Sequence, residues 1–423
     1  MRQKFIKLIG VASVTAALLN PVAQAETIAL KGGTLHTVSG AGMIENGTMV
    51  ITDGKITAVG TDVKIPSDAR VIDTTGKVIV PGFMNSNSRL GLSEISMTRD
   101  SNEHSAKGSP FGAAFDVRYG LNSHSIVIAE NRRQGLTHAL SQASRASGVF
   151  KGQGAIISLD GARDMIMAPG PMSAMIASGG NRNVAWAKVR LILDQVKHYA
   201  RNRSNVLKGK GRSDYMLDPN NMDALIPVVK GEQALYLHLN SENDILQAIA
   251  LKKDMDVKVI IVGASEAWRV AADLARENVA VVIDPQDNLP TDFGNASASY
   301  GNAALLEKAG VNFAITPGGM GANHNAYMVN QVAGIAVGHG LSWDMALKSI
   351  TLAPAQIFGI DKDYGSLEKG KIANVVVWDG DPLEVTSNPD HVIIKGTEFE
   401  LKSRRSMLRD RYKDLSKAPF AMQ

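Results

Sequence analysis

The chain has 423 residues, of which 44% are hydrophobic and 20% are charged, and it contains no cysteine. This composition is typical of a folded globular protein with a sizeable core, and it excludes a disulfide framework and a cysteine nucleophile. The formal net charge is only +4, so we expect no nucleic-acid partner.

The first 25 residues are predicted to be a secretory signal peptide. Three basic residues, Arg2, Lys4 and Lys7, precede an apolar run over residues 9–19, and an A-x-A cleavage motif occupies residues 23–25. The apolar run is too short to span a bilayer. Cleavage would remove three positive charges and lower the formal charge from +4 to +1. We therefore expect a periplasmic or secreted protein with no membrane span after cleavage.

Short β-strand signals occur near both ends of the remaining chain. Two apolar runs flank Asp53-Gly54, which is a favourable two-residue hairpin turn. Further β-type runs lie at Ala373–Trp378 and His391–Lys395. Because these segments bracket a long α/β region, we expect residues 26–77 and 365–400 to form one composite β-sandwich domain.

Residues 78–364 alternate apolar runs with helical periodicity, which predicts an α/β fold, a TIM-like (β/α)8 barrel. Helical periodicity is clearest at Asn183–Tyr199, where apolar residues recur at three- and four-residue spacing. Residues 401–423 are predicted to form a basic C-terminal helix or tail. The predicted barrel strands are Val78–Val80, Thr137–Leu140, Ala155–Leu159, Ala234–Leu239, Val257–Val262, Val279–Ile283 and Val311–Thr316.

Two motifs carry a family resemblance. The apolar run Val78-Ile79-Val80 leads into Pro81-Gly82 and then into small polar residues that end at Arg89. This stretch resembles the first barrel strand of the amidohydrolase superfamily. Residues 365–383, which end in Trp-Asp-Gly-Asp-Pro-Leu, resemble the return segment of imidazolonepropionase-like members. The resemblance, closest to the imidazolonepropionase-like and prolidase-like branch, implies metal-dependent hydrolysis of C–N bonds in small amides, cyclic amides or short peptides.

The family's metal ligands are mostly replaced in this sequence. The resemblance implies a His-x-His pair on the first strand, a lysine on a middle strand, histidines on strands five and six, and an aspartate on strand eight. Only the strand-five histidine, His238, is kept. Arginine has no lone pair to give to a metal, so we expect no metal cofactor. The family positions are occupied by Asn87, Arg89, Ser158, His238, Gly263 and either Pro317 or Gly318.

Two functional hypotheses follow. The first is a metal-free pseudoenzyme or small-ligand-binding protein, in which Arg89 neutralises a carboxylate-bearing ligand with help from Asn87, His238 and Asn240. The second is an active amidohydrolase that holds one divalent metal, such as zinc, at a non-standard site. Both leave open a homo-oligomer or a pairing with an active relative. The candidate residues of the second hypothesis are His238, His324, Asp284, His104 and Glu94.

Overall fold

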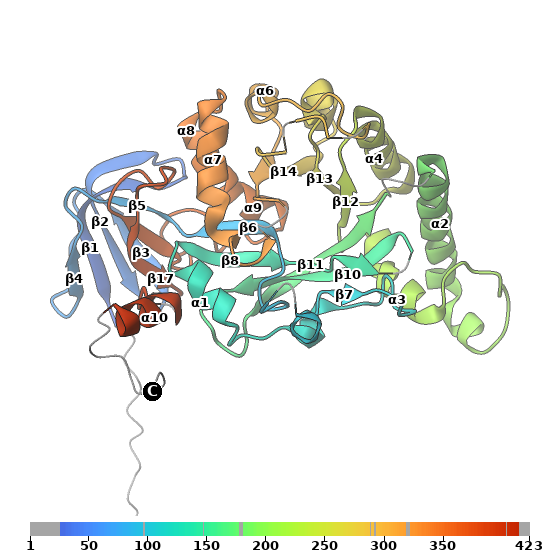
Figure 1. Ribbon diagram of the computed structural model, residues 1–423, viewed down its shortest axis with the longest axis horizontal. Coiled ribbons are helices and arrows are strands. Elements are labelled where there is room, and N and C mark those ends of the chain that lie inside the picture. The colour runs from blue at the N-terminus through green and yellow to red at the C-terminus, as the bar shows by residue number, and fades with distance from the viewer. Residues whose placement is uncertain are drawn as a thin grey trace, which may run out of the picture.

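The computed structural model describes residues 26–95, 98–146, 148–176, 181–287, 289–291, 293–318, 322–402 and 404–413. The predicted signal peptide lies outside these residues. Two sheets organise the chain, one at the left of Figure 1 and one through its centre. Within the described residues, no helix is long and apolar enough to cross a membrane.

Strands from both ends of the chain form the first sheet (Figure 1), here called the terminal sheet. Its N-terminal and C-terminal parts join where β5 pairs antiparallel with β16. Asp53 and Gly54 connect β2 to β3 with φ angles of 52° and 75°, as a tight hairpin turn of the predicted kind requires. The strands are β1 (Ile28–His36), β2 (Met43–Thr52), β3 (Lys55–Gly60), β4 (Arg70–Asp73), β5 (Val78–Pro81), β16 (Val375–Trp378), β17 (Pro389–Ile394) and β18 (Thr397–Phe399).

The prediction that Val78–Val80 is the first barrel strand is wrong. These residues belong to β5, which pairs with β1 and β16 in the terminal sheet. Ile79 packs into the core of the terminal sheet, whereas Val80 packs into the core of the α/β region. A strand buried on both faces has the continuous apolar pattern of a parallel barrel strand, so its sequence does not reveal which sheet it joins.

The second sheet confirms the predicted barrel class. Eight strands follow the order β15-β14-β13-β12-β11-β10-β8-β6. All neighbours are parallel except β10, which runs antiparallel to β8 and β11. The strands are β6 (Phe83–Ser88), β8 (Leu136–Ser141), β10 (Phe150–Ser158), β11 (Ile166–Met175), β12 (Leu235–Leu239), β13 (Val259–Gly263), β14 (Ala280–Ile283) and β15 (Phe313–Ile315).

Two barrel strands, β6 and β11, were not predicted. β6 is mostly polar, and two of its buried side chains bond inside the protein: Asn85 Nδ2 donates to Ala326 O and Ser88 Oγ donates to Leu140 O. Ser86 Oγ is buried without a hydrogen-bond partner among the described residues. β11 contains Pro169-Gly170-Pro171, which are residues that normally interrupt a strand. In both strands, tertiary contacts override the local sequence signal.

Helices lie outside the barrel sheet, with α4, α6, α7 and α8 along its upper side and α2 at the right in Figure 1. The predicted helix at Asn183–Tyr199 is the central part of α2. The helices are α1 (Ile126–Arg132), α2 (Arg182–Leu207), α3 (Pro219–Val229), α4 (Glu242–Met255), α5 (Ala271–Arg276), α6 (Asn302–Lys308), α7 (Val329–Gly338), α8 (Trp343–Ser349), α9 (Leu352–Ile357) and α10 (Arg404–Tyr412).

Candidate functional site

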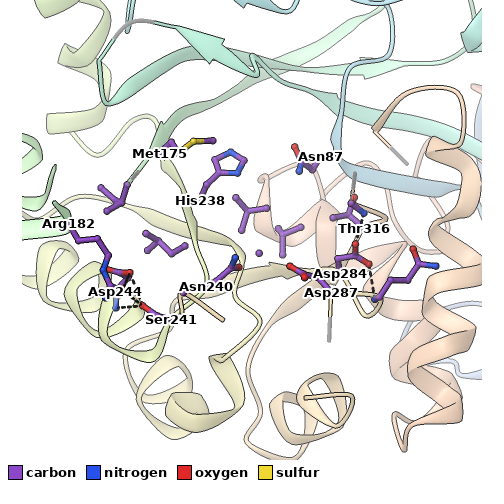
Figure 2. A pocket seen from close by; sticks show the side chains of 18 of the residues that line it. Asn87, Met175, Arg182, His238, Asn240, Ser241, Asp244, Asp284, Asp287 and Thr316 are labelled. Carbon is purple, nitrogen blue, oxygen red and sulfur yellow. Dashed lines mark hydrogen bonds and ion pairs between the residues drawn. The ribbon is translucent and has the colours of Figure 1, made fainter. Parts of the chain in front are cut away.

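A cavity of about 830 Å³ opens where the parallel barrel strands end. Its wall takes Asn87 from β6, Met175 from β11, His238 from β12 and Gly263 from β13, and Thr316 just after β15. Figure 2 shows these side chains around one space. The carboxyl ends of barrel strands are where such folds place their sites, so we take this cavity as the candidate site.

His238 faces the cavity as a neutral ring. Its Nε2 lies 3.3 Å from Ser173 Oγ, and its ring meets Tyr236 edge-on at 5.6 Å between centroids. Burial, with a smaller contribution from the ammonium group of Lys151, lowers the pKa of His238 to about 4. The imidazole therefore carries no charge at pH 7.

Two asparagines predicted for ligand binding also line the cavity. The backbone N–H of Asn87 donates to Asn85 Oδ1 at 2.8 Å, which fixes the end of β6. Asn240 follows β12, and its Oδ1 is buried without a hydrogen-bond partner among the described residues. A buried acceptor without a partner costs free energy, so Asn240 Oδ1 is available to a donor on a ligand.

Asp284 places a carboxylate on the same wall. It follows β14, and its oxygens accept from Gln286 N at 2.9 Å and Gly318 N at 2.8 Å. Burial, aided by the nearby charge of Asp287, raises the pKa of Asp284 above its usual value although both hydrogen bonds oppose the shift. Asp287 is a further cavity residue (Figure 2).

A paired charge forms the opposite wall. Arg182 Nη1 lies 2.9 Å from Asp244 Oδ2, and the same carboxylate accepts from Trp186 Nε1 and Ser241 Oγ (Figure 2). These residues were not predicted as site residues. Ser241-x-x-Asp244 follows β12 and has the pattern of a helix N-terminal capping box. The sequence therefore indicates that a helix begins here, but it does not indicate that these side chains face the cavity.

Two other predicted residues, Arg89 and His104, lie away from the cavity wall. Arg89, just past the end of β6, is not among the lining residues. Its half-buried guanidinium lies near Arg145, and burial followed by that like charge lowers the pKa of Arg89. His104 Nδ1 lies 2.6 Å from Ser144 Oγ, and burial followed by Arg89 lowers the pKa of His104 to about 4.

The remaining loop candidates are also dispersed. His324 is exposed on the loop after β15 and does not line the cavity. Glu94 accepts from Asn122 Nδ2 and Ile126 N, which ties it to the start of α1. Of the five residues proposed for a non-standard metal site, the structure brings only His238 and Asp284 to the cavity.

Ser158 does not occupy the middle-strand lysine position. Because β10 runs antiparallel, Ser158 pairs with His138 near the start of β8, at the opposite end of the barrel. The middle strand that ends at the cavity is β11, where Met175 is in register with His238. The direction of β10 could not be read from its apolar pattern, which is why Met175 was missed.

At two family positions, the space beside a glycine is filled. A Cβ atom at Gly263 would lie 2.4 Å from Asn240 Oδ1, and one at Gly318 would lie 2.5 Å from Asp284 Oδ2. A histidine at the first position or an aspartate at the second would not fit without moving these oxygens. Asn240 and Asp284 therefore pack into the space beside the two glycines.

The residues present do not fit the family's metal centre. Among the described ranges, no three His, Cys, Asp or Glu side chains are grouped so that they could hold a metal ion. A zinc site normally needs at least three protein ligands, whereas the cavity wall offers one imidazole, the amides of Asn87 and Asn240, a thioether and glycines at the corresponding places.

Comparisons with known proteins agree with the fold. A family model described as "Amidohydrolase family" matches residues 259–399. The chain is 22% identical over 408 residues to imidazolonepropionase from Symbiobacterium thermophilum, with 84% of this chain and 89% of that protein covered. It is 22% identical over 370 residues to adenine deaminase from Rubrobacter xylanophilus, with 85% of this chain but only 55% of that protein covered. A short match to amidohydrolase tasK from Hapsidospora irregularis, 44% identical over 59 residues, covers 14% of this chain and 6% of that protein.

Solved structures show the same architecture. An amidohydrolase from Thermotoga maritima superposes with a TM-score of 0.78 at 23% identity, covering 88% of this chain and 99% of that one. A prolidase complexed with N-methylphosphonate-L-proline gives a TM-score of 0.53 at 18% identity, covering 88% of this chain and 99% of that one. The solved structures therefore show that the chain has the barrel fold of amidohydrolases, and the family model and the relatives are similar to it over the ranges given above.

Proposed function

We propose that this protein is a metal-free member of the amidohydrolase superfamily that binds a small organic ligand in the barrel-end cavity. The observation that carries the proposal is the set of side chains around His238. Met175 is in register beside it, and Gly263 and Gly318 leave space that Asn240 and Asp284 fill. A lone imidazole cannot replace a metal centre, whereas the same wall offers hydrogen-bonding groups around a space of ligand size.

A working hydrolase is the second candidate. One observation favours it: His238 and Asp284 share the cavity, and burial raises the pKa of the Asp284 carboxyl. Carboxyl groups with raised pKa values serve as general acids or bases in many active sites. This candidate requires a divalent metal, such as zinc, held by ligands other than the family's, and it predicts that a chelator abolishes hydrolysis of a small amide or dipeptide.

We also propose that the protein is exported, as the N-terminal basic and apolar segments and the cleavage motif indicate. Expression of the full chain in a bacterial host should yield a periplasmic product. Mass spectrometry of that product should find an N-terminus at Glu26. A product that keeps residues 1–25 and stays in the cytoplasm would contradict this.

Ligand binding is tested by a thermal-shift screen of small amides, amino acids and amines, with and without a chelator, on residues 26–423. We expect ligands that raise the melting temperature equally in both conditions. Met175→Trp should abolish these shifts because the larger side chain projects into the cavity beside His238 and obstructs the ligand there. Met43→Trp, at an exposed residue of β2 far from the cavity, is the matched control.

The opposite pattern would refute the proposal. Ligand shifts that survive Met175→Trp would place binding elsewhere. Hydrolysis of an amide that depends on a metal and is lost in Met175→Trp would establish the second candidate instead.

A further inference from the structure

We propose that the cavity selects a cationic ligand that bears an amine, with the Asp284 carboxylate as its counter-charge. This inference rests on the proposed ligand-binding function and names its ligand class. It differs from the carboxylate-bearing ligand expected from the sequence, because the arginine behind that expectation, Arg89, does not line the cavity.

The charged residues of the wall are unequal in sign. They comprise one cation, Arg182, and three carboxylates, on Asp244, Asp284 and Asp287. Arg182 forms an ion pair with Asp244, with 2.9 Å between Nη1 and Oδ2. The remaining carboxylates lie on the loop after β14, so the wall has an excess of negative charge there.

Among the described residues of the wall, no second cation stands beside Asp284. Lys151 lies near His238, but its ammonium group donates to the carbonyl oxygens of Ala146 at 3.1 Å and Gly148 at 2.8 Å, and it does not line the cavity. His238 is neutral because burial lowers its pKa to about 4. The wall therefore offers no free cation to a carboxylate ligand among its described residues.

Asp284 is positioned to receive a donor. Its oxygens accept hydrogen bonds from two backbone N–H groups, and no Lys, Arg or His among the described residues forms an ion pair with it. Each carboxylate oxygen can accept a further hydrogen bond. An ammonium group supplies both the donor and the charge that a partly buried carboxylate lacks.

Two neighbouring residues, Asn240 and Phe293, also favour an amine-bearing ligand. Asn240 Oδ1, buried and without a partner, is an acceptor for a second N–H of the ligand. Phe293 lines the cavity but is fully exposed, so its ring is available to the apolar part of a ligand. Together these groups fit an amine carried on a short apolar or aromatic skeleton.

The test compares three probes with one skeleton: 2-phenylethylamine, 2-phenylethanol and 3-phenylpropanoate. Binding to residues 26–423 is measured by ligand-observed NMR titration at pH 7. We expect the amine to bind at least about tenfold more tightly than either other probe, since a charged partner in a hydrogen bond is worth well over one kcal/mol. Asp284→Asn should remove this preference and leave the affinity for the alcohol unchanged.

A second pair of variants tests the position of the Asp284 carboxylate without replacing Asp284, in case Asp284→Asn alters the local structure. Gly318→Ala adds a Cβ that would lie 2.5 Å from Asp284 Oδ2 and should displace the carboxylate, which weakens amine binding while its charge is kept. Gly338→Ala, where nothing lies within 4 Å of the added Cβ, should bind like the wild type. Tighter binding of 3-phenylpropanoate, or amine binding unchanged in both Asp284→Asn and Gly318→Ala, would overturn the inference.

These outcomes separate the two proposals. If the carboxylate or the alcohol binds best and Met175→Trp abolishes that binding, the ligand class is wrong and the ligand-binding function stands. If none of the three probes binds and hydrolysis proves metal-dependent, both proposals fail.

Discussion

Two glycines explain how other side chains occupy the space beside former ligand positions. Gly263 has a φ angle of +94°, and its neighbour Asn240 packs where a Cβ would be. Gly318 lies in the same relation to Asp284. The two glycines are therefore coupled to their polar neighbours, because Asn240 and Asp284 pack against the places where their Cβ atoms would be.

This packing predicts the cost of adding a single carbon. Gly263→Ala should lower the free energy of unfolding by about 2 to 4 kcal/mol, from backbone strain at positive φ together with the contact to Asn240 Oδ1. Gly340 has a similar φ of +98°, but the nearest atom to an added Cβ is 3.7 Å away. Gly340→Ala should therefore show the strain alone, about 1 kcal/mol. Equal losses in urea unfolding would show that Asn240 does not press on this position.

Sequence reasoning at this scale succeeded where a residue lies within a regular strand and failed beyond it. His238 and Asn87 were placed by the resemblance to the family's strand-five and first-strand ligand positions, and both line the cavity. Arg89 was expected beside them, but β6 ends at Ser88, after an irregularity in its pairing with β8. Past that point Arg89 N donates to Ala322 O and its guanidinium lies near Arg145 of β9 (Arg145–Ala146), and no alternation rule applies.

At the scale of elements, strand direction decided which residues reach the cavity. The apolar runs of β8, β10 and β12 to β15 were all visible in the sequence. A run of apolar residues looks the same in either direction, so the sequence did not reveal that β10 runs antiparallel. For that reason the sequence also did not reveal at which end of the barrel Ser158 lies. β11 was hidden by Pro169 and Pro171, which pattern rules treat as strand breakers.

The closure of the barrel depends on side chains of β6. In the sheet order β6 and β15 are the two ends, with no ladder recorded between them. Asn85 bridges this seam: its Nδ2 donates to Ala326 O, and its Oδ1 accepts from Asn87 N and from Thr316 Oγ1 at 3.0 Å. The polarity that hid β6 from sequence reasoning is the feature that closes the barrel.

Removing this bridge should be costly. Asn85→Ala leaves buried groups on both sides of the seam without partners, and we expect a loss of about 2 to 4 kcal/mol in the free energy of unfolding. The control is Asn243→Ala on the exposed face of α4, which should change stability by less than about 0.5 kcal/mol. If urea titrations give the same midpoint for both variants, the seam does not depend on Asn85.

For the whole molecule, the fold class was readable because it repeats one pattern many times. Alternating apolar and helical stretches between two β-rich ends sufficed for a barrel with an appended sheet. The assignment of Val78–Pro81 was not readable, because β5 contributes Ile79 to one core and Val80 to the other. The boundary between the two units runs through that strand.

The barrel core also predicts an acid sensitivity. His138 is fully buried, and burial lowers its pKa to about 3. His138 therefore takes up a proton near pH 6.5 in the unfolded chain but only near pH 3 in the folded chain. Protonation of the unfolded chain lowers the free energy of unfolding as the pH falls from about 6.5 toward 3, by about 1.4 kcal/mol per pH unit, and has no effect above about pH 6.5. His138→Phe should reduce the slope of the free energy of unfolding between pH 6.5 and 4.5 in urea unfolding, and His104 and His238, whose pKa values burial also lowers to about 4, should account for the slope that remains. His124→Phe, at an exposed residue, should leave the slope unchanged, and equal slopes in all three proteins would contradict this role for His138.

The central claim is that Asn87, Met175, Gly263 and Gly318 leave His238 without the partners that a metal needs. Its most direct test is the metal content of the protein, purified without chelator and measured by inductively coupled plasma mass spectrometry. We predict zinc, iron and manganese at far below one ion per chain, because no three His, Asp or Glu side chains of the described residues are grouped so that they could hold one ion. One ion per chain, retained through dialysis and lost in His238→Ala, would contradict the account and would direct the search to amide or dipeptide substrates.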